Sequence, residues 1–348
     1  QLILTVEELD FKIKEYTLAE SVNLQEQLQL SWSKSFNLEA GPLLRCEYIK
    51  HGARSILSFN LHHIISDGWS IGVLFADVIQ SYKQLLAKES GELLPLEIQY
   101  KDFANWQIEQ LSNEKLNEQL SYWRDTVFSS GITPIELPYD FDRPQLKTYH
   151  GELFVKKFPK QMTEKIALQA TENGVSLYMS LMVNVGILLK KLSGQSDITI
   201  GSPVSGRDSA QLDKQIGFYV NTLALRSNIS SNRSVKELLL EQRESLLAAF
   251  DYQNFPFEML VDELQPKRDL SRSPLFDVMV TLQSFGGQEN ETVVLEDTVS
   301  FNQIELSSGN TKYDLTFSFN EVAFAERCRG DTITGKSGTN NKRVRVIV

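Results

Sequence analysis

The amino-acid sequence predicts a mixed α/β fold, of the α+β type with mixed sheets, arranged in two lobes. The chain has 348 residues, of which 41% are hydrophobic, which is enough for one large core or two ordinary ones. Segments with strand-like and helix-like hydrophobic periods are interleaved in both halves. Between the halves, the Pro- and Asp-rich residues 134–144 lack periodicity, and we interpret them as an inter-lobe linker.

The first lobe is expected over residues 1–133. Its clearest strand, residues 55–63, places Leu57, Phe59 and Leu61 on one face and Ile56, Ser58 and Asn60 on the other. If this alternation continues, His62 and His63 point to opposite faces. The other expected elements are a helix within 17–36, a strand over 42–50, an amphipathic helix from Asp67-Gly68 to Gly91, and a long helical segment over 100–127.

The second lobe is expected over residues 145–324. A capping box formed by Ser234 and Glu237 predicts the start of one helix, and a Ser176 cap predicts another that stops at Gly194. The expected strands are 151–158, 197–204, 216–227, 275–285 and 312–322, and the expected helices are 163–172, 177–193 and 235–250.

Residues 325–348 form an atypical basic tail. This segment carries a net charge of +4, whereas the whole chain carries −10, and it has no apolar periodicity. We interpret it as an unrelated or disordered end. Residues 330–337 satisfy the phosphate-loop pattern GxxxxGK[ST], but no buried strand precedes them and no helix follows, so nucleotide binding is not expected. The segment "GSPVSGR", residues 201–207, is likewise predicted to be a turn after a strand.

Composition argues against several classes of protein. The net charge of −10 disfavours nucleic acid and anionic membranes as partners. Cys46 and Cys328 form neither a metal cluster nor a disulfide framework, and no run approaches the ~18 apolar residues of a membrane span. We therefore expect a cytoplasmic protein. The chain starts with Gln1, inside apparent strand patterning, and we interpret it as a piece of a longer one.

Two adjacent histidines precede an Asp-Gly pair in "HHIISDGWS", residues 62–70, at a strand-to-helix turn. One explanation is structural: two hydrogen-bonded histidines and Asp67 as the cap of the following helix. The other is chemical: an imidazole takes a proton from a nucleophile, and His63 is the better base because imidazoles titrate near neutral pH. Asp67, stabilised as a carboxylate by the helix N-terminus, is expected to organise the turn rather than to react.

The segment "HHIISDGWS" resembles the HHxxxDG signature of nonribosomal peptide synthetase condensation domains and of chloramphenicol acetyltransferase-like acyltransferases. Four further segments resemble condensation-domain motifs in order and spacing. They are "YKDFANW" (100–106), "IGFYVNTLALR" (216–226), "YQNFPFEMLVDEL" (252–264) and "RDLSRSPLFDVMV" (268–280). The first motif together with "VNTLALR" resembles the subtype that couples L-configured donors.

The resemblance implies a V-shaped, two-lobed chloramphenicol acetyltransferase-like fold with a central tunnel. Upstream and downstream peptidyl carrier domains would each present a thioester on a 4'-phosphopantetheine arm. The acceptor amine attacks the donor thioester and an amide forms, largely because tethering both substrates supplies a high effective concentration. An adjacent adenylation domain is an expected partner, and no permanently bound cofactor or metal is expected.

The resemblance also implies roles for the motif residues. His63 is the candidate base or orienter of the amine, Asp67 is structural, Gly68 allows a tight turn, and His62 is packed. The substrate-tunnel candidates are Trp69, Ser70 and Asn221, although Asn221 can equally serve a strand-end hydrogen bond and Trp69, like Trp106 and Phe218, is more typical of core or lobe-contact aromatics.

Two departures from the family pattern stand out. An upstream arginine motif, whose arginine pairs with the residue that corresponds to Asp67, would precede Gln1, so we expect Asp67 to lack this partner. The resemblance also ends at about Ala323. Two alternatives therefore stay open: a CoA- or thioester-dependent acyltransferase of the same superfamily, and a noncatalytic carrier-docking fragment.

Overall fold

The structure, a computed structural model, describes residues 5, 8–9, 11–111, 114–267, 269–283, 293–295, 299–301, 309–323 and 342–347. The chain divides into two compact units. Unit 1 contains residues 1–106 and 207–220, and unit 2 contains residues 107–206 and 221–348. Each unit is described by itself.

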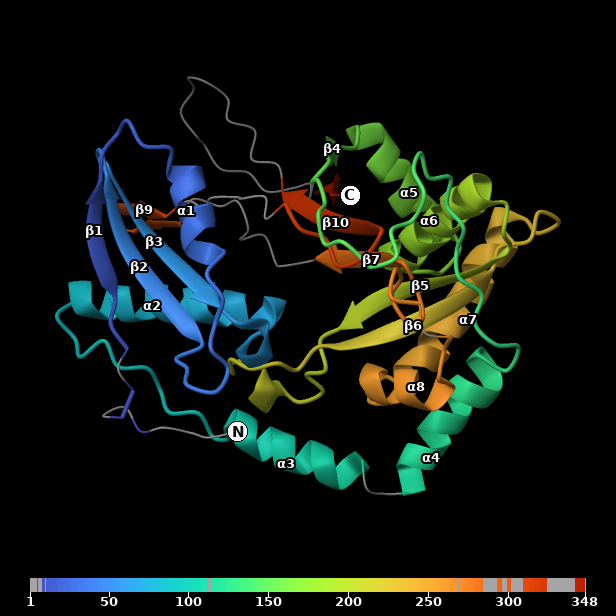
Figure 1. Cartoon of the computed structure of the whole chain (residues 1–348), viewed down its shortest axis with the longest axis horizontal. Helices are drawn as coiled ribbons and strands as arrows, with labels where there is room; N and C mark the ends of the chain where they lie inside the picture. Colours follow the sequence, from blue (N-terminus) through green and yellow to red (C-terminus); the bar gives the residue numbers. More distant parts are fainter. Residues whose placement is uncertain are drawn as a thin grey trace. The chain divides into compact units, whose positions relative to one another are not determined.

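Unit 1 is built on a three-stranded sheet of order β1-β2-β3 (Figure 1). β1 runs parallel to β2, and β2 runs antiparallel to β3. The elements are β1 (Lys14–Leu18), α1 (Leu24–Trp32), β2 (Leu44–His51), β3 (Arg54–Leu61), the 3₁₀ turn η1 (His63–Ile65), α2 (Gly68–Leu86), the start of α3 (Tyr100–Leu111) and the 3₁₀ turn η3 (Ala210–Leu212).

Helices α1 and α2 cover opposite faces of this sheet. Their contacts show this, because α1 and α2 touch successive residues of β3, whose side chains point to opposite faces. Trp32 of α1 donates from Nε1 to Ser58 Oγ at 3.0 Å. Phe75 of α2 packs against Phe59 in a T-shaped contact with 6.0 Å between ring centroids. The predicted alternation along β3 is confirmed by the buried Ser58 and its exposed neighbour Leu57.

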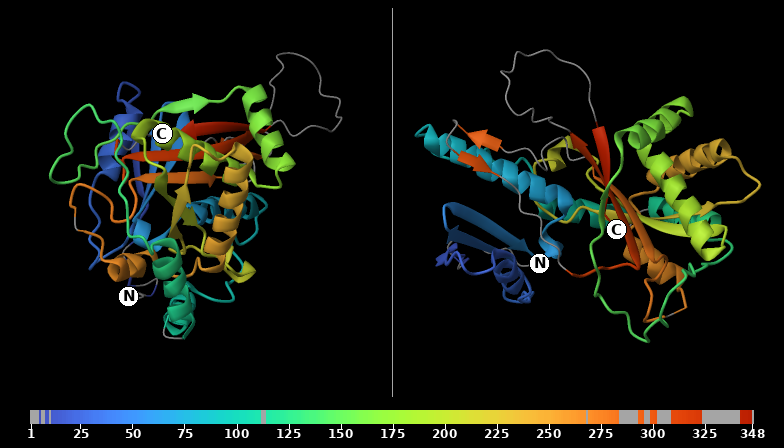
Figure 2. Two further views of the ribbon diagram at one scale, coloured as in Figure 1. Left: turned by 90° about the vertical axis from the view of Figure 1, so that its right-hand side faces the viewer. Right: turned by 90° about the horizontal axis from the view of Figure 1, so that it is seen from above.

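Unit 2 contains a six-stranded sheet of order β4-β11-β10-β7-β5-β6, with both parallel and antiparallel pairs. Figure 2 shows helices α5, α6 and α7 on one face of this sheet. The elements are α4 (Glu114–Ser121), the π-helix η2 (Tyr122–Val127), β4 (Val155–Lys157), α5 (Lys160–Glu172), α6 (Leu177–Ser193), β5 (Asp197–Val204), β6 (Asn221–Asn228), α7 (Val235–Asp251), α8 (Phe257–Leu264), β7 (Val278–Gln283), the pair β8 (Val293–Leu295) and β9 (Val299–Phe301), β10 (Leu315–Ala323) and β11 (Lys342–Ile347).

The expected linker, residues 134–144, belongs to unit 2. Ile135 is 3% exposed in the hydrophobic core, and Arg143 donates to Ser271 O at 2.9 Å and pairs with Asp314. Single side chains anchor this segment, and because they do not recur at a regular spacing, the sequence shows no hydrophobic periodicity there. The division also differs from the expected lobes because residues 107–133 lie in unit 2 and residues 207–220 lie in unit 1.

Two further segments differ from expectation. The helical segment predicted over 100–127 is divided into α3, α4 and a final π-helical turn. In the basic tail, β11 pairs antiparallel with β10 and β4, so this part is a strand rather than disordered. Residues 324–341, which include the phosphate-loop pattern and Cys328, lie outside the described residues.

Among the described residues, none of the individual helices has the length and hydropathy that a membrane span requires. Helices α5 and α6 pass that test only as a pair, by length and composition, with a bend of 109° between them.

Candidate functional site

The histidine motif occupies the turn that joins β3 to α2 in unit 1. The strand ends at Leu61, so the two histidines do not continue its alternation, and His63 instead begins the 3₁₀ turn. Asp67 separates the 3₁₀ turn from helix α2, because its backbone is extended, with φ −124° and ψ −178°. Gly68 is the first helical residue, so the tight turn expected of it is made by its neighbour instead.

His62 and His63 form opposite kinds of hydrogen bond. His62 Nδ1 accepts from Ile64 N–H at 3.1 Å, whereas His63 Nδ1 lies 2.6 Å from Ser66 O. A carbonyl oxygen only accepts, so His63 must carry its hydrogen on Nδ1. In their neutral forms, His62 therefore holds its hydrogen on Nε2, and His63 has an unprotonated Nε2.

This difference decides which histidine can act as a base. Only the Nε2 atom of neutral His63 has a lone pair that can take a proton from a nucleophile. His63 is exposed, whereas His62 is half-buried and contacts Phe36 edge-on with 5.9 Å between ring centroids. The geometry thus packs His62 against Phe36 and leaves Nε2 of neutral His63 available to accept a proton; the role of His63 as a base stays a prediction.

Asp67 is 5% exposed and its carboxylate is held by backbone and side-chain donors. Oδ1 accepts from the Ser70 N–H at 2.8 Å, and Oδ2 accepts from the Tyr219 N–H at 3.1 Å. The first bond makes Asp67 the N-cap of α2. Its lone pairs are engaged in shaping the turn, as the sequence predicted for an organising residue.

Arg207 is the ion-pair partner of Asp67 in the structure. Its Nη2 lies 3.3 Å from Asp67 Oδ1, and the two side chains are 2% and 4% exposed. Nη1 donates to Leu212 O and, at 3.0 Å, to Gln215 O. The expectation of an unpaired Asp67 concerned only an upstream arginine, whereas this partner lies about 140 residues later in the chain.

Ser70 lies inside the same network rather than at a substrate-facing surface. It is 1% exposed, and its hydroxyl lies 2.7 Å from Asp67 Oδ1 and 2.8 Å from Gly217 O. The hydroxyl oxygen also accepts from Gly217 N–H and Arg207 Nη2, both at 3.1 Å. Ser70 therefore connects the turn to residues 207–220. Trp69 is 44% exposed and donates from Nε1 to Asp213 O at 2.8 Å.

An aromatic cluster supports this network from within unit 1. Tyr219, Phe103 and Tyr100 pack together, with 4.6 Å between the ring centroids of Phe103 and Tyr219. Burial raises the pKa of Tyr219 to about 12, so its hydroxyl stays protonated and donates to Gln215 Oε1. The Arg207 guanidinium lies 4.1 Å from the centre of the Tyr219 ring, a cation–π contact on the side chain that pairs with Asp67.

Asn221 is used structurally inside unit 2. Its amide nitrogen donates to Gln253 O at 2.7 Å and Phe255 O at 2.8 Å, and its oxygen accepts from Phe257 N–H at 3.1 Å. Both amide hydrogens and the oxygen are thus occupied in holding the start of α8. This geometry favours the hydrogen-bonding alternative over a role as a tunnel residue.

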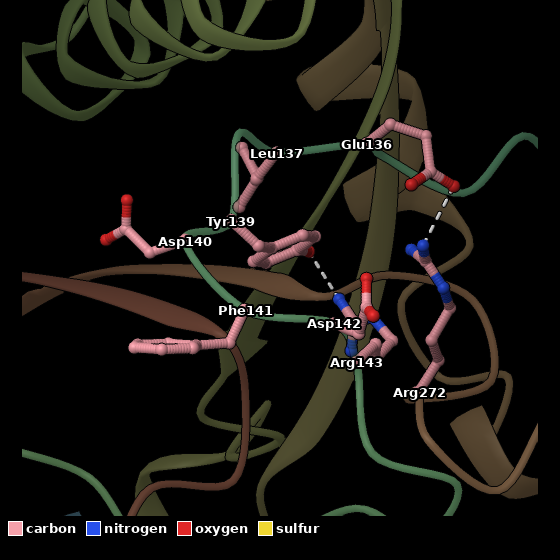
Figure 3. A pocket seen from close by; sticks show the side chains of 8 residues that line it. All are labelled: Glu136, Leu137, Tyr139, Asp140, Phe141, Asp142, Arg143 and Arg272. Carbon is pink, nitrogen blue, oxygen red and sulfur yellow. Dashed lines mark hydrogen bonds and ion pairs between the residues drawn. The ribbon is translucent and has the colours of Figure 1, made fainter.

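Unit 2 also carries a hollow of about 590 Å³, which is far from the histidine motif in sequence and is drawn in Figure 3. Its arginines are paired: Arg272 Nη2 lies 2.8 Å from Glu136 Oε1, and Arg143 donates to the Tyr139 hydroxyl. We interpret the hollow as the surface of a structural ion network. Its lining consists of Glu136, Leu137, Tyr139, Asp140, Phe141, Asp142, Arg143 and Arg272.

In the part of the chain that the structure describes, no group of three or more His, Cys, Asp or Glu side chains is arranged to hold a metal ion. Cys46 is buried there as a free thiol.

Sequence reasoning missed Arg207, Gly217 and Tyr219. The signal for all three was present, since "SGR" and "IGFYVNT" flank a polar loop after a predicted strand. What the sequence does not show is that this loop leaves β5, joins unit 1 and returns to β6. That path brings Arg207 and Tyr219 onto Asp67.

Known proteins are similar to this chain in sequence. Gramicidin S synthase 2 of Brevibacillus brevis is 37% identical over 297 residues, which are 85% of this chain and 6% of that protein. Bacitracin synthase 2 of Bacillus licheniformis is 36% identical over 318 residues, 91% of this chain and 12% of that protein. The chain therefore spans only a small part of the length of these relatives.

Solved structures agree on the fold. The X-domain from teicoplanin biosynthesis superposes with a TM-score of 0.83 at 20% identity, covering 100% of this chain and 74% of that one. The first condensation domain of the calcium-dependent antibiotic synthetase gives a TM-score of 0.71 at 16% identity, covering 97% and 70%. A family model described as the condensation domain matches residues 1–326, which end near Ala323, where the resemblance was expected to stop. This chain belongs to the condensation domain family.

Proposed function

We propose that this chain forms amide bonds between two carrier-bound substrates, with His63 as the base. The observation that carries the proposal is the Nδ1 bond of His63 to Ser66 O at 2.6 Å, which leaves Nε2 of the neutral ring able to take a proton. Family membership supplies the reaction class. The V-shaped arrangement and the tunnel implied by the resemblance remain part of the proposal.

The reaction conserves atoms and protons within the site. The amine nitrogen of the acceptor attacks the carbonyl carbon of the donor thioester, the C–N bond forms and the C–S bond breaks. The proton leaves the nitrogen for His63 Nε2 and then reaches the departing thiolate of the donor arm. Asp67 and Arg207 take no proton in this scheme, because they hold the turn that carries His63.

The partners follow from this chemistry. Upstream and downstream peptidyl carrier domains deliver the two substrates on 4'-phosphopantetheine arms, and an adjacent adenylation domain selects an amino acid. We propose L-configured donors and acceptors, from the motif subtype, and a cytoplasmic setting. The arms arrive with the substrates and are not resident cofactors.

The test is amide formation between two carrier proteins, each charged with an L-aminoacyl thioester, followed by mass spectrometry of both arms. We expect a dipeptidyl group on the acceptor arm and a free thiol on the donor arm. A D-configured donor should react more slowly. Equal product from an aminoacyl-CoA donor would favour the acyltransferase alternative, and carrier binding without product would favour the docking fragment.

A further inference from the structure

We infer that Phe218 is a positioning residue that holds the His63 imidazole in its working orientation. Both residues belong to unit 1, and their rings meet in a T-shaped contact with 5.3 Å between centroids and 74° between planes. Edge-to-face geometry at this distance is a favoured arrangement of aromatic rings. The part of the inference that concerns the rate of amide formation rests on the proposed function of His63.

The backbone around Phe218 is fixed on both sides. Ser70 Oγ bonds to the amide nitrogen and to the oxygen of Gly217, and the Tyr219 N–H donates to Asp67. The Phe218 carbonyl itself accepts from the Tyr100 hydroxyl at 2.9 Å. The direction in which the Phe218 side chain leaves the backbone is therefore set by the same turn that carries His63.

Glycine at 217 is part of this arrangement. A Cβ atom added to Gly217 would lie 2.4 Å from Tyr100 Cδ2 and 2.7 Å from Tyr219 Cε2. The absence of a side chain therefore lets the Tyr100 ring lie against the backbone while its hydroxyl reaches Phe218 O. The segments that contain Tyr100 and Phe218 are thus joined at the histidine turn.

The imidazole needs this second contact. The bond from Nδ1 to Ser66 O fixes one edge of the His63 ring, but the ring is exposed, and one hydrogen bond leaves rotation about its axis open. Phe218, which is 36% exposed, blocks one side of that rotation. It acts through His63 and takes no part in proton transfer.

The test compares Phe218→Leu, Phe218→Ala and Phe218→Tyr with a matched control. Phe75→Leu removes a similarly exposed aromatic ring of unit 1, 42% exposed, whose T-shaped partner is Phe59 rather than a histidine. The first measurement is ¹⁵N NMR of the histidine side chains, in which His63→Ala assigns the two ring-nitrogen signals of one of the four histidines. The second is the rate of amide formation between loaded carriers, with kcat and KM determined separately.

We expect ¹⁵N shifts of a predominant Nδ1–H tautomer for His63 in the unchanged chain and a mixture of tautomers in the Leu and Ala variants. We expect kcat to fall about two- to tenfold with KM unchanged, the range that one T-shaped aromatic contact supports. Phe218→Tyr should keep the ¹⁵N shifts of His63 and the kcat of the unchanged chain, and Phe75→Leu should change neither quantity.

Two results would overturn the inference: unchanged ¹⁵N shifts of His63 in Phe218→Ala, or altered shifts with an unchanged kcat. The NMR measurement needs no substrate. If the unchanged chain makes no amide, the proposed function fails on its own, while the NMR shifts still decide whether Phe218 positions His63.

Discussion

Replacing Arg207 with Met would leave the Asp67 carboxylate buried without its cationic partner. The side chains of the pair are 2% and 4% exposed, so water cannot replace the guanidinium without opening unit 1. Breaking such a buried pair from one side costs about 3–5 kcal/mol of unfolding free energy. A domain has roughly 5–15 kcal/mol in total, so the loss would be a large fraction of the stability of unit 1.

Urea unfolding followed by tryptophan fluorescence measures this loss, because Trp32, Trp69 and Trp106, three of the four tryptophans, belong to unit 1. In a double-mutant cycle, Arg207→Met and Asp67→Asn together should cost less than the sum of the single changes, with a coupling of about 0.5–3 kcal/mol.

The matched control is Lys50→Met. Lys50 Nζ lies 2.9 Å from Glu15 Oε1 in the same unit, but the two side chains are 53% and 60% exposed, so the urea midpoint should stay unchanged. Additive losses in the cycle, or a loss in Arg207→Met no larger than that of this control, would refute the reasoning.

Three further predictions concern single side chains. Asn221→Ala should lower the melting temperature of unit 2 through a loss of about 1–3 kcal/mol, because Phe257 N–H and two carbonyls lose their partner; an unchanged melting curve with altered substrate preference would contradict the structural role. Gly217→Ala should destabilise unit 1 by about 1–3 kcal/mol in urea, since its Cβ would collide with the Tyr100 ring, and a neutral effect would argue against the close packing. The hydrogen bond from Arg226 holds the pKa of Asp197 below its usual 3.8, so its stabilisation is present above pH 3.8 and is lost as the pH falls through the lower folded pKa. Thermal unfolding of Asp197→Asn should therefore show a deficit at neutral pH that shrinks in strong acid, and a deficit independent of pH would contradict this assignment.

Local features of the fold follow closely from the sequence. The caps at Ser176 and Ser234 and the stop at Gly194 are where the pattern places them, because each depends on a few adjacent residues. The division into units does not follow, since residues 207–220 leave one unit and join the other without a change in composition. Long-range placement of this kind is determined by burial of single anchors such as Ile135 and Arg207, which leave no periodic signal.

In the candidate site too, features set by adjacent residues could be predicted, whereas contacts between residues far apart in the sequence could not. The choice of His63 over His62 as the base stays a prediction, whereas the turn and the cap at Asp67 were predictable from nine consecutive residues. The partner of Asp67 was not, because Arg207 lies about 140 residues away. Ser70 was expected near substrate but is 1% exposed, which its position after Trp69 could not reveal.

The most direct test of the proposed role of His63 is single-turnover amide formation by the unchanged chain, His63→Ala and His62→Ala. The two histidines are adjacent, and they differ in which ring nitrogen carries the hydrogen. If His63 Nε2 is the base, His63→Ala should lose at least about a hundredfold in rate, the lower end of what general-base catalysis supplies, and His62→Ala should lose far less. An equal or larger loss in His62→Ala, or an undiminished rate in His63→Ala, would contradict it.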